Sequence, residues 1–289
     1  MTARDMVLMP GCSLDGAGLE YGRSTLAVLE ALGKPIGVLE DWNCCGASAA
    51  RSTKPALSAR LSARNLALAA AQGCDVIVNC AACYNNLSHS QSYLRDHPNE
   101  WSEADTGQPA PVESTSVYHL ITVLTTEEML ERLRRQIVRP LDDMLLACYY
   151  GCLLTRPGGY TYADDPENPG LMEKLVELCG AKTVDWSYKT DCCGGSFSLT
   201  EPEAALELMG RLFTAAGEQD ATAMVTACPL CQMNLDALQR QVGKAIGREL
   251  SLPIYYFTEL LALAMDLDGV EKWFKGHMTK IAPAARKCR

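Results

Sequence analysis

Long hydrophobic runs are absent from this sequence of 289 residues, and positive charge is scarce. Apolar stretches such as 66–71 and 260–265 are far shorter than the roughly 20 residues that cross a bilayer, so we expect no membrane span. Residues 1–11 lack the pattern of a signal peptide, which favours a cytoplasmic protein. The formal net charge of −9 argues against nucleic acid as a partner, because phosphate binding needs a basic surface.

Two electron-transfer motifs are also missing. The sequence has neither the C-x2-C-x2-C-x3-C-P run of ferredoxins nor the G-x-G-x-x-G fingerprint of flavin and nicotinamide sites. If the chain carries out redox chemistry, a partner must therefore supply its electrons. The histidines show no metal-ligand spacing and are interpreted as surface residues or as core residues with satisfied hydrogen bonds; they are His89, His97, His119 and His277.

Cysteine, by contrast, is abundant, with 14 residues in the chain. Cytosolic reductants keep thiols reduced, so metal binding or redox catalysis is a better explanation than disulfides. Ten cysteines form two sets, Cys12, Cys44, Cys45, Cys80 and Cys83 in the first half and Cys152, Cys192, Cys193, Cys228 and Cys231 in the second. The last four members of the two sets differ by a constant offset of 148, which also relates Asn86 to Asn234. This pattern predicts an internal duplication.

Alternation of short apolar runs with helical patterns predicts an α/β fold in each copy, with a parallel sheet. Strands expected at 6–9, 75–79, 144–149 and 223–226 each lead into a cysteine, which places the cysteines on strand-to-helix loops. We predict two tandem, pseudo-symmetric domains, 1–140 and 141–289. The polar stretch 95–116 is expected to be a loop or linker, and loop residues at 157–159 and 166–170 an insertion.

Two further local features are predicted near the ends of these domains. Thr125 and Glu128 form a potential capping box for a helix that would end before Pro140. The basic stretch 271–289 is interpreted as a solvated tail, with a docking strip for an acidic partner as the alternative.

The metal chemistry of each set is decided by its number of thiols. Zinc takes four ligands in structural sites, and five cysteines are one too many. Adjacent residues such as Cys44 and Cys45 have diverging side chains, which suit neighbouring irons of one cluster better than one small ion. An iron–sulfur cluster is therefore favoured, with zinc and a dithiol switch as alternatives. Cys148 is a fallback for Cys152, and Gly46, Gly194 and Gly195 are expected to let backbone N–H groups approach the cluster.

The repeated pattern of one cysteine, a Cys-Cys-Gly and a C-x2-C resembles the CCG cysteine-rich domain, and almost the whole chain resembles the B subunit of heterodisulfide reductases. The resemblance implies one noncubane [4Fe–4S] cluster per repeat, held by the two sets of five cysteines named above. It also implies reduction of a disulfide between the two clusters, with Cys45 and Cys193 acting through them.

Partners and substrate follow from the same resemblance. The ferredoxin-like C subunit of such a complex, itself served by the flavoprotein A subunit, would exchange electrons with this chain. The substrate would be a small-molecule or protein-bound disulfide, thiol or sulfane sulfur. Related CCG proteins act in lactate, glycolate and glycerol-phosphate oxidation, so an electron relay without disulfide chemistry is the alternative function.

Overall fold

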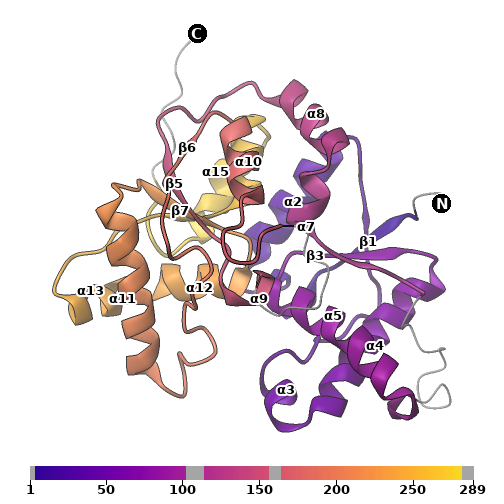
Figure 1. The fold of residues 1–289 in the computed structure, drawn as a ribbon. Coiled ribbons are helices and arrows are strands. Elements are labelled where there is room, and N and C mark those ends of the chain that lie inside the picture. The colour runs from indigo at the N-terminus through magenta and orange to yellow at the C-terminus, as the bar shows by residue number, and fades with distance from the viewer. Residues whose placement is uncertain (1–3, 102–113, 156–163, 282–289) are drawn as a thin grey trace.

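The computed structural model describes residues 4–101, 114–155 and 164–281, and it contains two four-stranded parallel sheets (Figure 1). The predicted α/β fold is confirmed. The first sheet has the order β2-β1-β3-β4 and the second the order β6-β5-β7-β8, so the same topology occurs twice. The strands are β1 (Met6–Met9), β2 (Gly37–Val38), β3 (Asp75–Val78), β4 (Val117–His119), β5 (Leu145–Tyr149), β6 (Lys182–Thr183), β7 (Ala223–Thr226) and β8 (Ile254–Tyr256).

Helices connect the strands in a matching order in the two halves. The first half contains α1 (Gly11–Leu14), α2 (Leu19–Ala31), α3 (Ala49–Thr53), α4 (Pro55–Ala71), α5 (Ala81–Asp96), a 3-10 helix over Pro98–Glu100, α7 (Leu120–Leu124) and α8 (Glu127–Gln136). The second half contains α9 (Cys152–Thr155), α10 (Leu171–Leu178), α11 (Pro202–Glu218), α12 (Pro229–Ala237), α13 (Gln239–Ile246), α14 (Phe257–Ala264), α15 (Val270–Trp273) and a 3-10 helix over Phe274–Gly276. None of the helices within the described ranges is long and apolar enough to cross a membrane.

The central strands are covered on both faces. All residues of β3 and β7 are buried, which explains why these strands appear in the sequence as short continuous apolar runs rather than as alternating ones. Pro55 and Pro202 occupy the first position of α4 and α11, where the missing N–H of proline costs nothing.

The two halves contact each other through α2 of the first half and α14 of the second, which pack together. The hydroxyl oxygens of Ser24 and Thr258 lie 2.6 Å apart, and both residues are fully buried. The rings of Tyr21 and Tyr256 stack with centroids 4.3 Å apart. The repeats therefore share part of their core, and the division at residues 140 and 141 remains a prediction.

Two local predictions differ from the structure, and a third is tested only in part. Helix α8 begins at Glu127 with Thr126 as its N-cap and ends at Gln136, and no side-chain cap is formed, so the capping box of Thr125 and Glu128 is wrong. The expected linker at 95–116 begins inside α5, whose last residue is Asp96, and much of the remainder lies outside the described residues. The insertion at 157–159 also lies outside them, whereas 166–170 is a loop as expected.

The stretch 271–281 is folded rather than a solvated tail. Trp273 and Phe274 are buried, and His277 Nε2 lies 2.9 Å from a carboxylate oxygen of Glu259 in α14. Apolar residues within this basic stretch provide the reason, since α15 packs against α14 and α2. Residues 282–289 lie outside the described part of the chain.

Candidate metal centre

The cysteines of each half gather at the carboxyl edge of its parallel sheet. Strand β3 ends just before Cys80, which is the N-cap of α5, and β7 stands in the same relation to Cys228 and α12. Cys83 and Cys231 lie in the first turn of these helices. Free backbone N–H groups and the positive end of the helix dipole at this position favour thiolates and other anions.

In the first half, the Sγ atoms of Cys45 and Cys83 lie 3.3 Å apart. Cys44 hydrogen bonds to Cys45, and Cys12 is close enough to Cys44 to affect its pKa. Cys45, Cys80 and Cys83 are buried, whereas Cys12 and Cys44 are exposed. The structure thus brings together the five cysteines of the predicted first set, with three inside and two at the surface.

The second half repeats this arrangement. The Sγ atoms of Cys193 and Cys231 lie 3.5 Å apart, and the thiols of Cys152 and Cys192 are hydrogen bonded. Cys193, Cys228 and Cys231 are buried, while Cys152 and Cys192 are partly exposed.

Cys148 does not take the place of Cys152. It lies within β5 and is fully buried, and its carbonyl oxygen accepts a hydrogen bond from the indole N–H of Trp186 at 3.0 Å. Cys152 is therefore the residue that joins the second set of thiols.

Several of these thiols are prepared to be thiolates. Hydrogen bonds from Cys44 and Cys83 lower the pKa of Cys45 to about 4, and a hydrogen bond from Cys152 lowers the pKa of Cys192 to about 6. Hydrogen bonds from Cys231 and Cys80 likewise lower the pKa of Cys228. Thiolates are the form that binds metals, so these lowered pKa values favour metal binding, whereas the same hydrogen bonds raise the pKa values of the partners Cys44 and Cys152.

The two sets of cysteines come close to each other at Cys80 and Cys228. The thiols of Cys80 and Cys228, which occupy equivalent places in the repeats, lie close enough across the boundary between the halves for each to shift the pKa of the other. A path of neighbouring sulfur atoms therefore runs from Cys45 through Cys83 and Cys80 into the second set.

Two asparagines hold the Cys-Cys-Gly turns against the C-x2-C helices. Asn86 Nδ2 in α5 donates to the carbonyl oxygen of Cys45 at 2.5 Å, and Asn234 Nδ2 in α12 donates to that of Cys193 at 2.6 Å. Both asparagines are buried. They were visible in the sequence as residues in the same register of the repeat, but the spacing of cysteines alone did not assign them to the site.

At the glycines that follow the cysteine pairs, the backbone lies close to neighbouring helices and thiols. Gly46 and Gly194 have φ values of +77° and +72°, in the left-handed region that favours glycine. A Cβ at Gly194 would lie 2.8 Å from the Cα of Ala205 in α11. The N–H of Gly194 donates to Cys192 Sγ at 3.3 Å, and that of Gly46 donates to Cys44. A Cβ at Gly195 would lie 3.4 Å from Cys193 Sγ. Their approach to cluster sulfides remains a prediction.

The donor chemistry of these sets fits an iron–sulfur cluster, since all ten candidate ligands are thiols. Over the described ranges, no three Cys, His, Asp or Glu side chains surround one point as the ligands of a single ion would. The sulfur spacings are those of hydrogen-bonded thiols.

Within the described residues, buried polar atoms without a hydrogen-bond partner include Tyr21 Oη and Asn79 Oδ1. Asn79 directly precedes Cys80, and Tyr21 is near enough to Cys80 and Cys228 for their charges to raise its pKa, although burial is the larger cause. Polar atoms thus remain available around the boundary contact.

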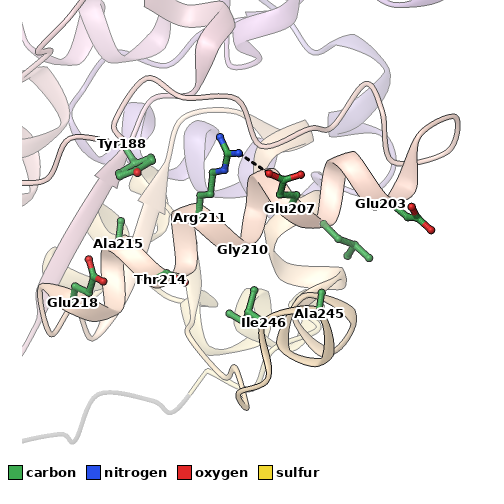
Figure 2. Close-up of a pocket in the computed structure, with 11 residues that line it drawn as sticks. Tyr188, Glu203, Glu207, Gly210, Arg211, Thr214, Ala215, Glu218, Ala245 and Ile246 are labelled. Carbon is green, nitrogen blue, oxygen red and sulfur yellow. Dashed lines mark hydrogen bonds and ion pairs between the residues drawn. The ribbon is translucent and has the colours of Figure 1, made fainter.

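A groove of about 520 Å³ lies away from the cysteines, between α11 and α13 (Figure 2). Its lining includes Leu206, Arg211 and Ile246 and contains no cysteine. Arg211 is paired with Glu207 on the same helix.

Comparison with known proteins defines the class of this chain. The model of the cysteine-rich domain CCG matches it twice, over residues 6–88 and 146–236. The chain belongs to the family of CCG cysteine-rich domain proteins and carries the domain in duplicate.

Several known proteins match this chain over most of their length. The chain is 29% identical to the 8-methylmenaquinol:fumarate reductase membrane anchor subunit of Wolinella succinogenes, over 93% of this chain and 94% of that protein. It is 28% identical to the B subunit of the ferredoxin/F420H2-dependent CoB-CoM heterodisulfide reductase of Methanosarcina acetivorans, over 89% and 88% of the two chains. The B subunit of the ferredoxin:CoB-CoM heterodisulfide reductase of Methanosarcina mazei is also 28% identical, over 92% of each chain.

A solved structure supports the fold. The crystal structure of a hypothetical protein from Helicobacter pylori superimposes with a TM-score of 0.74 at 14% sequence identity. The match covers 96% of this chain and 52% of that chain, so this chain spans about half of its length.

Proposed function

We propose that this chain binds two [4Fe–4S] clusters of the noncubane type, one in each repeat, and serves as the catalytic subunit of a heterodisulfide reductase-like complex. One observation carries the proposal: the two equivalent sets of thiols come together at Cys80 and Cys228. The ligands of the first cluster are Cys12, Cys44, Cys45, Cys80 and Cys83, and those of the second are Cys152, Cys192, Cys193, Cys228 and Cys231.

Disulfide reduction requires two electrons and two protons, and it yields two thiols. Each bound cluster supplies one-electron redox chemistry. Two such centres on either side of the boundary contact match the number of electrons. The chain's own residues would arrange this site. Buried thiols such as Cys45 and Cys193 would keep water away from the part of the site inside the protein. The partly exposed Cys152 and Cys192 would leave its surface side open to substrate. Cys45 and Cys193 are the proposed catalytic positions, acting through the clusters. Gly46, Gly194 and Gly195 are proposed to bring the backbone close to them.

The names of the relatives support a role in an oxidoreductase complex. Two of them are called B subunits of CoB-CoM heterodisulfide reductases. We infer that electrons reach this chain from a ferredoxin-like C subunit and a flavoprotein A subunit. The proposed substrate class is a disulfide, small or protein-bound, or the corresponding thiol or sulfane sulfur, with the chain working in the cytoplasm.

An electron relay without disulfide chemistry is the second candidate. It is favoured by the relative whose name places it in a fumarate reductase, because its identity of 29% is as high as that of the heterodisulfide reductase proteins. A further relative is named lactate utilization protein A and is 23% identical. In this case the same ligands would hold clusters that pass electrons onward.

The deciding experiment begins with anaerobically purified or reconstituted protein. Two clusters predict about eight irons per chain and visible charge-transfer absorption. One zinc per repeat without this absorption would eliminate both proposals.

A second experiment separates the two candidates. Oxidised protein is treated with coenzyme M, coenzyme B or dithiothreitol and monitored by electron paramagnetic resonance. New paramagnetic signals with a thiol favour a catalytic site, whereas an unchanged spectrum favours the relay.

A further inference from the structure

His119 connects the two halves at the place where their cysteines meet. It is the last residue of β4 and is fully buried. Its Nε2 lies 3.0 Å from the carbonyl oxygen of Asn79 and 3.1 Å from that of Ala227. Carbonyl oxygens only accept hydrogen bonds, so Nε2 carries the proton and donates to both.

The second ring nitrogen fixes the same tautomer. His119 Nδ1 accepts a hydrogen bond from the backbone N–H of Ile121 at 3.3 Å. Burial lowers the pKa of His119 to about 4, so the ring is neutral near pH 7 and carries its single proton on Nε2. The imidazole is therefore held as a donor pointing at the two carbonyl groups.

These two carbonyl groups occupy equivalent positions in the repeats. Asn79 and Ala227 are related by the offset of 148, and they directly precede Cys80 and Cys228. One N–H group thus holds matching points of both copies, next to the thiols that touch across the boundary.

Only the first repeat contributes such a residue. His119 pairs with Val78 in the first sheet, and Tyr256 pairs with the equivalent Thr226 in the second, so Tyr256 takes the place of His119. The hydroxyl of Tyr256 instead donates to Oε1 of Gln232 at 3.1 Å, within its own repeat. The duplicated position has diverged: His119 hydrogen bonds to the backbone of both repeats, whereas Tyr256 contacts the first repeat through the stacking of its ring on Tyr21.

We propose that His119 is a positioning residue that sets the distance between the two cysteine sets, by holding the backbone just before Cys80 and Cys228. This inference deepens the proposed function and rests on it to the extent that each set holds a redox centre. The delivery of two electrons to one substrate depends on the geometry of both centres, and a displacement of about 1 Å can reduce a rate about 100-fold.

The first test uses reduced, metal-free protein, so that it does not depend on cluster assembly. His119→Phe keeps an aromatic ring but has no donor. Tyr256→Phe is the matched control, because it removes a buried hydrogen bond at the equivalent position without affecting the bridge. The proteins are oxidised with diamide, and disulfide-linked peptides are quantified by mass spectrometry.

We expect the yield of the Cys80–Cys228 link to fall about tenfold in His119→Phe, because disulfide formation tolerates only a narrow range of Cα separations. The Cys45–Cys83 and Cys193–Cys231 links form within one repeat, where the sulfur atoms lie 3.3 and 3.5 Å apart, and serve as internal controls. Their yields should change by less than about twofold in the same samples.

His119→Gln tests rescue, since its amide group can still donate to both carbonyl oxygens. We expect it to recover most of the wild-type yield of the Cys80–Cys228 link. If His119→Phe does not fold, His119→Asn, whose side chain is shorter, replaces it in the same comparison. An unchanged link in the donor-free variant, or an equal loss in Tyr256→Phe, would overturn the proposal.

The second test uses the iron-loaded protein reduced with dithionite. His119→Phe should keep the iron content and alter the magnetic interaction between the two centres in the electron paramagnetic resonance spectrum, while Tyr256→Phe should retain the wild-type spectrum. If the wild-type protein takes up no iron, the proposed function fails, and the cross-linking yields still decide whether His119 positions the repeats. If iron binds and neither measurement responds to His119→Phe, the positioning role fails alone.

Discussion

The side-chain amide of Asn234 donates a hydrogen bond of 2.6 Å to the backbone carbonyl group of Cys193. The equivalent bond joins Asn86 to Cys45 in the first repeat. Each bond ties the turn that presents two adjacent cysteines to the helix that presents the C-x2-C motif. Four of the five thiols in each set are thereby held in one unit, and the duplication has preserved this unit in both copies.

Replacing Asn234 by leucine should weaken the second repeat. The substitution retains the size of the side chain but leaves the carbonyl group of Cys193 without this buried donor, which costs about 1–3 kcal/mol in the free energy of unfolding. Urea unfolding of the reduced, metal-free protein measures this loss. Met233→Leu, at an exposed position of the same helix, is the control and should change stability by no more than about 0.5 kcal/mol. Equal stability of Asn234→Leu and wild type would contradict the role of the bond.

Substitution of a single cysteine should remove one cluster only. Cys45→Ala and Cys193→Ala each delete a buried thiol from one repeat, so we expect about four irons per chain instead of about eight, with the remaining cluster visible by absorption. Iron and sulfide analysis after anaerobic reconstitution provides the measurement. Cys74→Ala is the control, since Cys74 belongs to neither set, and it should retain the full iron content. Loss of both clusters in either variant would mean that the ten thiols form one shared site.

The sequence predicted the parts of this fold that repeat or that have a regular period. The strands over Met6–Met9 and Ala223–Thr226 lie where the apolar runs placed them, because a strand buried on both faces has a simple pattern. The α/β fold follows from the alternation of such runs with helical segments. The gathering of the cysteines follows from the rule that the carboxyl ends of parallel strands share one edge.

The relationships between the repeats could not be predicted in this way. His119 shows no ligand spacing, and we interpreted it as a surface residue or as a core residue with satisfied hydrogen bonds. It is such a core residue. Its partners, however, come from two segments that are distant in sequence. A contact within one repeat was equally hidden, since the hydrogen bond of His277 with Glu259 helps to hold the expected solvated tail in folded structure. The spacing of apolar residues predicts one helix or strand at a time. A tertiary contact between distant segments produces no such regular spacing in the sequence.

The buried His119 should also make stability depend on pH. Its pKa of about 4 in the folded protein is below the usual value of about 6.5, so between these values the unfolded chain binds a proton that the folded chain does not. The contribution of neutral His119 to the free energy of unfolding is fully present above pH 6.5. It decreases as the pH falls toward 4, by up to about 3 kcal/mol in total. Urea unfolding from pH 7.5 to 4.5 should therefore show a weaker decline in His119→Gln than in wild type. His97→Gln, at an exposed position, should follow the wild-type curve, and parallel curves for all three proteins would contradict the assignment.

The close approach at Gly194 predicts a graded response to alanine. Gly194 and Gly247 have nearly the same positive φ, +72° and +71°, so alanine should cause a similar strain of about 1–2 kcal/mol at either position. Their surroundings differ, because a Cβ at Gly194 would lie 2.8 Å from the Cα of Ala205, whereas nothing lies within 4 Å of a Cβ at Gly247. Gly194→Ala should therefore cost about 1–3 kcal/mol more than Gly247→Ala, since the turn must move away from α11. Urea unfolding of the metal-free proteins measures this difference. In the iron-loaded protein, only Gly194→Ala should disturb the second cluster, because this turn carries Cys192 and Cys193. Equal losses of stability in the two variants would show that backbone strain alone, and not contact with the helix, explains the glycine.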